Sequence, residues 1–119
     1  MKQYRRADRV GEEILRAVSR LFEGELSGEV KGMVTFTHVR LSADLRYAAV
    51  YYSVLGSDAD RKAVEDLFGR DGKRIRHLIG QQMRMRHVPE FRFKYDPSVE
   101  EGIRIEQLLN EIKSGKANS

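Results

Sequence analysis

The sequence lacks several features on which whole classes of protein depend. Its 119 residues contain no cysteine. The chain therefore forms no disulfide and no thiolate zinc site, which suits a reducing compartment. The longest uncharged stretch, from Tyr47 to Ser57, is too short to cross a bilayer. The first residues lead into charge rather than into the apolar run of a signal peptide. These absences predict a cytoplasmic protein without a membrane segment.

Motifs that would mark an enzyme are also missing. The chain contains no Gly-x-x-x-x-Gly-Lys-Ser/Thr loop for a nucleotide and no Gly-x-Ser-x-Gly nucleophile elbow. Its three histidines fall on separate expected elements, without the His-x-x-x-His spacing of a metal site. His38 lies in an expected strand and is best explained as a hydrogen-bonded structural residue. We therefore expect no catalytic residue, no metal site and no cofactor.

Length and composition favour one folded domain. A chain of 119 residues is long enough for one hydrophobic core and too short for two. Hydrophobic residues make up 40% and charged residues 34%, which is typical of a globular protein rather than a disordered one. We expect a single domain over residues 1–113. A flexible tail should follow over 114–119, where the composition is Ser-Gly-Lys-Ala-Asn-Ser.

Hydrophobic periodicity divides this domain into helices and strands. Apolar residues at helical spacing distinguish the helices, and runs of β-branched and aromatic residues distinguish the strands. The pattern predicts a helix at 8–25, strands at 33–41 and 47–55, helices at 58–68 and 72–86, a strand at 91–95 and a short last helix around 105–112. The two early strands are joined so briefly that they should pair antiparallel. The core should contain Val10, Ile14, Val18, Ile75, Leu78, Ile79 and Phe93.

Positive charge is concentrated in one part of the chain. Between Gly69 and Tyr95, eight lysines and arginines face only two carboxylates, a net charge of +6 in a chain that carries +4 overall. The stretch opens with Gly69 and Gly72, which predict a tight turn before a basic helix. A Gly-x-x-Gly turn followed by a helix N-terminus can clamp a nucleic-acid backbone. We expect RNA contacts from Arg70, Lys73, Arg74, Arg76, His77, Arg84 and Arg86. The alternative is a solvated surface of mixed charge.

The expected strand at 91–95 alternates strictly between aromatic and cationic residues. Phe91, Phe93 and Tyr95 share one face, and Arg92 and Lys94 share the other. Aromatic side chains at this spacing favour a place in the core. A platform on which bases stack is the alternative.

Three groups of residues along the chain together resemble one family. The first is Val34-Thr35-Phe36-Thr37-His38-Val39-Arg40-Leu41-Ser42-Ala43-Asp44-Leu45, and the second is Ala48-Ala49-Val50-Tyr51-Tyr52-Ser53. The third combines Met83-Arg84-Met85-Arg86, Val88-Pro89-Glu90-Phe91 and Gly102-Ile103-Arg104-Ile105. In this order they resemble the ribosome-binding factor A family, over essentially the whole chain from Arg5 to Ile112.

The order of the expected elements is that of an α+β protein with a type II KH-like fold, and the family resemblance agrees with it. Its order would be helix-strand-strand-helix-helix-strand with a short C-terminal helix, and helices would cover one face of a three-stranded sheet. The resemblance further implies a bacterial, non-enzymatic assembly factor that binds the free small (30S) ribosomal subunit. The partners would be that subunit and 16S rRNA or its precursor, whose 5′ region the factor helps to mature. We expect a monomer. The alternative is a protein-interaction module or a general KH-type RNA-binding protein not dedicated to the ribosome.

One departure from the family pattern concerns the junction of the two later helices. In the family these helices meet at a kink usually written Ala-x-Gly. Alignment on Ile75-Arg76 places Asp71 and Lys73 at the positions of that alanine and glycine. We therefore expect the kink to involve Gly69, Asp71 and Gly72, either as a bend alone or as a loop that clamps phosphate.

Overall fold

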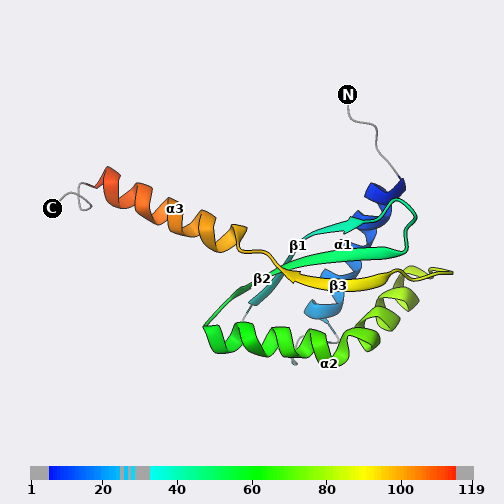
Figure 1. Cartoon of the computed structure of the whole chain (residues 1–119). Helices are drawn as coiled ribbons and strands as arrows, with labels where there is room; N and C mark the ends of the chain where they lie inside the picture. The colour runs from blue at the N-terminus through cyan, green and yellow to red at the C-terminus, as the bar shows by residue number, and fades with distance from the viewer. Residues whose placement is uncertain (1–5, 25, 27, 29–32, 115–119) are drawn as a thin grey trace.

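A three-stranded sheet lies at the centre of the protein, with helices packed against one of its faces (Figure 1). The computed structural model describes residues 6–24, 26, 28 and 33–114. Its elements are α1 (Arg6–Glu23), β1 (Met33–Leu41), β2 (Tyr47–Leu55), α2 (Asp58–Met83), β3 (Glu90–Tyr95) and α3 (Ser98–Lys113). Apart from Ser114, the tail expected at 114–119 lies outside the described residues.

The sheet combines one antiparallel and one parallel pair of strands, in the order β1-β2-β3. β1 and β2 are antiparallel, as predicted, and in the turn between them the Ser42 hydroxyl donates to the Asp44 carboxylate over 2.7 Å. β3 runs parallel to β2. A parallel pair needs a long crossover connection, and α2 supplies it. The β1–β2 register shifts between Phe36 and His38, so Thr37 lies in a β-bulge.

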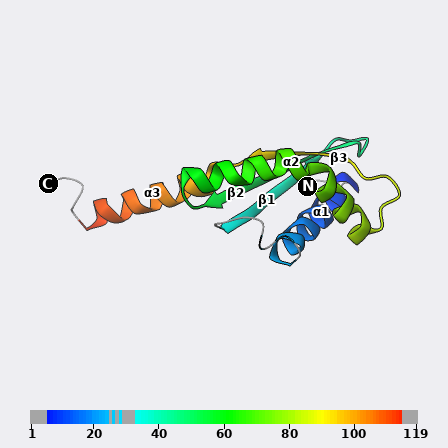
Figure 2. The same ribbon diagram turned by 90° about the horizontal axis from the view of Figure 1, so that it is seen from below.

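The hydrophobic core lies between the sheet and the first two helices. α1 is behind the strands in Figure 1 and below them in Figure 2, so it covers one face of the sheet. The prediction of the core residues is confirmed. Four of them are at most 1% exposed, namely Ile14, Val18, Ile75 and Ile79. The other three are partly buried and pack against this core, namely Val10, Leu78 and Phe93.

The aromatic residues of β3 belong to this core. The Phe93 ring stacks on Phe68 of α2, with centroids 4.2 Å apart and planes 8° apart. Tyr95 and Tyr52 meet edge to face at 5.8 Å. Phe91 packs edge-on against Phe93 and is also partly buried. The face of β3 that carries these rings therefore meets the helices, as predicted, and the base-stacking alternative does not apply to them.

α2 is one continuous helix of 26 residues, so the predicted turn at Gly69–Gly72 is wrong. The helix begins with a capping box in which the Ser57 hydroxyl accepts from the Asp60 N–H and the Asp60 carboxylate accepts from the Ser57 N–H. Each interior glycine costs about 1 kcal/mol relative to alanine. Burial of apolar residues on both sides of the glycines, such as Leu67 and Ile75, offsets that cost. Figure 1 shows that the helix axis bends partway along rather than breaking.

α3 projects away from the sheet (Figures 1 and 2). It begins just after Pro97 and runs to Lys113, so it is longer than the predicted last helix. Five of its large apolar side chains are exposed, namely Ile103, Ile105, Leu108, Leu109 and Ile112. The described chain thus has the expected α+β, type II KH-like architecture, except that the two later helices are joined into one.

Candidate nucleic-acid interface

The basic surface is formed where α2 ends and the chain turns back toward β3. The helix ends at Met83, and Arg84 adopts the left-handed conformation with φ 54° and ψ 38°. The Arg84 N–H donates to the carbonyls of Gln81 and Gly80, so it satisfies groups that the helix end would leave free. A residue other than glycine adopts this conformation rarely. Its effect is to reverse the chain direction, so that residues 85–89 run back beside the helix.

Two contacts fix this returning segment against α2. The Arg76 guanidinium donates through Nε to the Pro89 carbonyl over 2.8 Å and through Nη2 to the Val88 carbonyl. Val88 also packs directly on Gly80, where an added methyl group would lie 2.5 Å from Val88 Cγ2. A glycine is needed at this position because any side chain would push the segment away.

The helix and the returning segment enclose a shallow basic hollow of about 690 Å³. Its lining is Lys73, Arg76, His77, Gly80, Gln81, Arg84, Met85, Arg86, His87 and Val88. Four of these residues are lysine or arginine, two are histidine, and none of the described lining residues is acidic. Within the described part of the chain, the side chains of Lys73, Arg84 and Arg86 form no ion pair. Such a hollow attracts phosphate groups.

A second, larger hollow of about 910 Å³ lies on the other side of the same segment, against α1 and the β1–β2 turn. It shares Arg76, Arg84 and Arg86 with the basic hollow. Its lining also includes Arg6 and Arg46, together with the carboxylates of Glu13, Asp44 and Glu90. A hydrogen bond from the Ser42 hydroxyl, with another from the Arg46 N–H, lowers the pKa of Asp44, so this carboxylate stays charged. The mixed charge makes this hollow a weaker phosphate site than the basic hollow.

The structure brings together five of the seven residues predicted to contact RNA. Lys73, Arg76, His77, Arg84 and Arg86 all line the basic hollow. Arg76 has a second role, because its bonds to the returning segment help to shape the hollow. Sequence alone did not predict this role, since its partners are 12 and 13 residues away in the chain.

Arg70 and Arg74 lie outside the lining of the basic hollow, although both are exposed. The Arg70 guanidinium forms a bidentate pair with the Asp71 carboxylate, with both N–O distances at 3.3 Å. Gly69, Asp71 and Gly72 are inside α2 rather than at a helix start. No helix N-terminus therefore lies at these residues to face a phosphate, and a methyl group added at Gly69 or Gly72 would meet no atom within 4 Å.

Four residues of the hollow were not among those predicted to contact RNA, namely Gln81, Met85, His87 and Val88. Gly80 was not predicted as a site residue either. The useful signal was Pro89, because a proline shortly after a helix marks the point where the chain must leave it. The direction of the return depends on the Arg84 backbone conformation, which no local pattern specifies.

The described residues contain no group of three or more histidine, cysteine, aspartate or glutamate residues placed to hold a metal ion. Among these residues, no helix is both long enough and apolar enough to span a membrane.

Comparison with known proteins gives one consistent result. The family model of ribosome-binding factor A matches residues 6–109. Ribosome-binding factor A of Geotalea uraniireducens is 40% identical over 113 residues, covering 95% of this chain and 93% of the relative. The solution NMR structure of a Thermotoga maritima protein described as a ribosome binding factor A has a TM-score of 0.65 at 30% identity, over 79% of this chain and 90% of that one.

A further structural match concerns the fold alone. A homology model of Thermus thermophilus ribosome binding factor A, fitted into the cryo-electron microscopy map of a 30S–RbfA complex, has a TM-score of 0.64 at 19% identity, over 76% of this chain and 96% of that one. The family match extends from α1 into α3 and includes the whole basic hollow. On these grounds the chain belongs to the ribosome-binding factor A family.

Proposed function

We propose that this protein binds the free small (30S) ribosomal subunit in the cytoplasm and assists its assembly, including maturation of the 5′ region of 16S rRNA. The observation that carries the proposal is the family match over residues 6–109. A Thermus thermophilus relative has been fitted into a map of a 30S complex, which supports the same partner. The protein acts by binding, as a monomer and without catalysis.

The basic hollow is the surface proposed to meet rRNA. Lys73, Arg84 and Arg86 contribute cations from both walls, and His77 and His87 add rings that can donate hydrogen bonds. Each phosphate that these cations neutralise releases counterions, so affinity should fall steeply with salt. Contacts to phosphate position a protein without reading sequence. Selectivity for the small subunit must then come from the shape of the rRNA that fits the hollow.

Co-sedimentation with purified small and large subunits tests the function. The protein should pellet with free small subunits at low salt and pellet much less with large subunits. Equal pelleting with both would contradict a dedicated small-subunit factor and favour a general RNA-binding protein. Binding that is insensitive to salt would instead indicate a protein-interaction module.

Charge reversal tests the surface. Lys73→Glu with Arg84→Glu should lower the affinity for small subunits and flatten the slope of log K against log salt by roughly one unit for each phosphate that is no longer neutralised. Arg16→Glu with Arg20→Glu, on α1 and away from the basic hollow, is the matched control. A larger loss of binding in the control would place the contact on α1. Arg76 is left unchanged because its reversal would also release the returning segment.

A further inference from the structure

The face of the sheet opposite the helices carries a second group of aromatic and cationic residues. Along each strand, side chains alternate between the two faces. Val39, Val50 and Phe93 point to the core and are paired across the three strands. The neighbours of these residues therefore project from the open face. They form the rows His38-Tyr51-Lys94 and Arg40-Ala49-Arg92, followed by Tyr47 beside Glu90.

Rings on this open face are arranged for stacking. The His38 imidazole lies on the Tyr51 ring, with centroids 4.1 Å apart and planes 12° apart. Tyr47 is 43% exposed, and the Arg92 guanidinium lies 5.7 Å from its ring centroid. Tyr47 and Tyr51 are four residues apart on β2, about 13 Å along the strand. The two sites are far enough apart to accept different bases.

A shallow hollow lies beside Tyr47, between β2 and β3. It has a volume of about 340 Å³ and is lined by Tyr47, Ala48, Ala49, Arg92 and Lys94. The hollow forms because Ala49 has a small side chain and lies between Arg40 and Arg92 in its row across the sheet. Arg92 and Lys94 lie at one side of it, on β3, and Arg40 lies across the sheet on β1. The arrangement places cations beside the rings, where the phosphates of a strand lying across the sheet would run.

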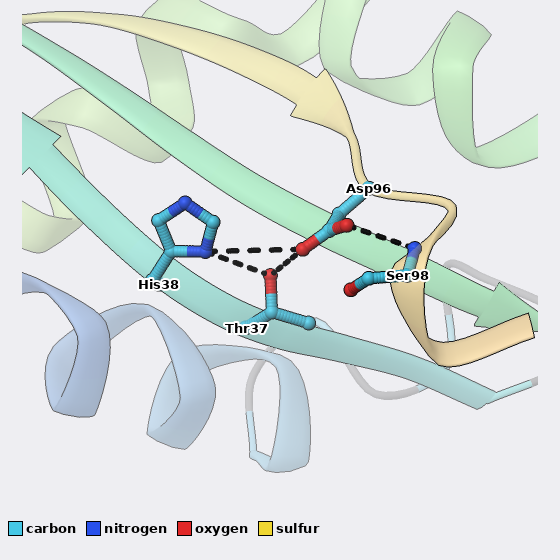
Figure 3. A network of polar contacts seen from close by, with 4 residues as sticks. All are labelled: Thr37, His38, Asp96 and Ser98. Atoms are coloured by element: carbon cyan, nitrogen blue, oxygen red, sulfur yellow. Dashed lines mark hydrogen bonds and ion pairs between the residues drawn. The ribbon is translucent and has the colours of Figure 1, made fainter. Parts of the chain in front are cut away.

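The acidic residues near this face do not cancel those cations. Asp96 accepts a hydrogen bond from the Thr37 hydroxyl over 2.8 Å and from the Ser98 N–H over 2.9 Å, and its carboxylate lies 3.8 Å from His38 Nδ1 (Figure 3). These bonds hold Asp96 at the end of the sheet, where it positions the His38 ring. Glu90 lies beside Tyr47, so the three cations of the face stand against two carboxylates, which leaves a net charge of +1.

We propose that the open sheet face binds an unpaired, single-stranded RNA segment, with bases stacked on Tyr47 and on the His38–Tyr51 pair and phosphates held by Arg40, Arg92 and Lys94. Single-stranded nucleic acid is recognised in this way elsewhere, by aromatic side chains on a sheet within a positive surface. The inference rests on the proposed function only for the class of ligand, RNA. It assigns a surface distinct from the basic hollow, so one protein can hold two RNA segments.

Binding of a short labelled oligouridine, measured by fluorescence anisotropy at low salt, tests this proposal. An RNA hairpin with the same number of phosphates serves as the paired ligand. The wild-type protein should bind the oligouridine more tightly than it binds the hairpin. Tyr47→Ala should weaken oligouridine binding by about 5- to 150-fold, the loss typical of one stacked base, whereas Tyr47→Phe should retain it. Because the chain has five tyrosines and no tryptophan, quenching of tyrosine fluorescence gives a second measure of stacking.

The matched control is the Lys73→Glu/Arg84→Glu variant of the basic hollow. The loss of oligouridine affinity should be larger in Tyr47→Ala than in the hollow variant, and the loss of hairpin affinity should be larger in the hollow variant than in Tyr47→Ala. An equal or larger loss of oligouridine binding in the hollow variant, or no loss in Tyr47→Ala, would overturn the proposal. If Tyr47→Ala weakens only the pelleting with small subunits, the face contacts protein and the proposal is wrong. Stacking on oligouridine without any subunit binding would refute the proposed function and leave this inference standing.

Discussion

Alanine substitutions at Gly80 and Gly72 of α2 separate helix propensity from packing. Both glycines lie inside the same helix. A methyl group at Gly72 would meet no atom within 4 Å, whereas one at Gly80 would lie 2.5 Å from Val88 Cγ2. The two substitutions are therefore chemically identical, and they differ in what the new methyl group contacts.

The structure gives the expected magnitudes. Gly72→Ala should raise the free energy of unfolding by about 0.5–1 kcal/mol, because alanine favours the helix. Gly80→Ala should gain the same free energy from helix propensity, but overpacking of the new methyl group against Val88 should cost about 1–3 kcal/mol. Val88 is stiff at χ1 and its carbonyl is held by Arg76, so the segment cannot yield without breaking those hydrogen bonds. The two variants should therefore differ by about 1–3 kcal/mol.

Thermal and urea unfolding followed by far-ultraviolet circular dichroism measure this difference. For a domain of this size, 1 kcal/mol corresponds to about 4 °C in Tm. Gly80→Ala should also weaken binding to small subunits, because the wall of the basic hollow moves. The double variant Gly80→Ala/Val88→Ala should recover part of both losses. If Gly72→Ala destabilises the protein as much as Gly80→Ala does, the bend of α2 requires glycine at 72 and the reasoning is refuted.

Three further predictions concern stability. Ile79→Ala should lower the free energy of unfolding by about 2–5 kcal/mol, because Ile79 is 1% exposed. Leu109→Ala on α3, where the side chain is exposed, should change it by less than about 0.5 kcal/mol. Similar losses in the two variants would mean that α3 is packed in solution. Arg76→Lys keeps the charge but removes the two hydrogen bonds to the Val88 and Pro89 carbonyls. The free energy of unfolding, measured with urea, should therefore fall by about 1 kcal/mol. An unchanged urea midpoint would contradict this role of Arg76. Hydrogen bonds from Ser98, then from Thr37, lower the pKa of Asp96 below its ordinary value of 3.8. Its contribution to stability is present above that value and is lost as pH falls through the lower folded-state pKa. The free energy of unfolding of Asp96→Asn should therefore depend less on pH, between about pH 5 and about pH 2, than that of the wild type.

Much of the fold could be predicted from local patterns in the sequence. The alternation of Phe91, Arg92 and Phe93 indicated the face of β3 that meets the core, because a strand's period of two is a property of the backbone. The helical spacing of Ile14 and Val18 likewise indicated the buried side of α1. The concentration of cations after residue 69 indicated the part of the chain that forms the basic hollow.

Other features depend on contacts between residues that are distant in the chain. Gly69 and Gly72 favour a turn locally, but burial on both sides of them keeps α2 continuous. The basic hollow exists because Arg76 and Gly80 hold a segment that returns beside the helix. His38 and Tyr51 stack because β1 and β2 pair in one register, past a bulge at Thr37. The sequence alone therefore determined which residues are buried and where charge is concentrated, whereas tertiary packing decided which side chains meet, since those contacts join separate elements.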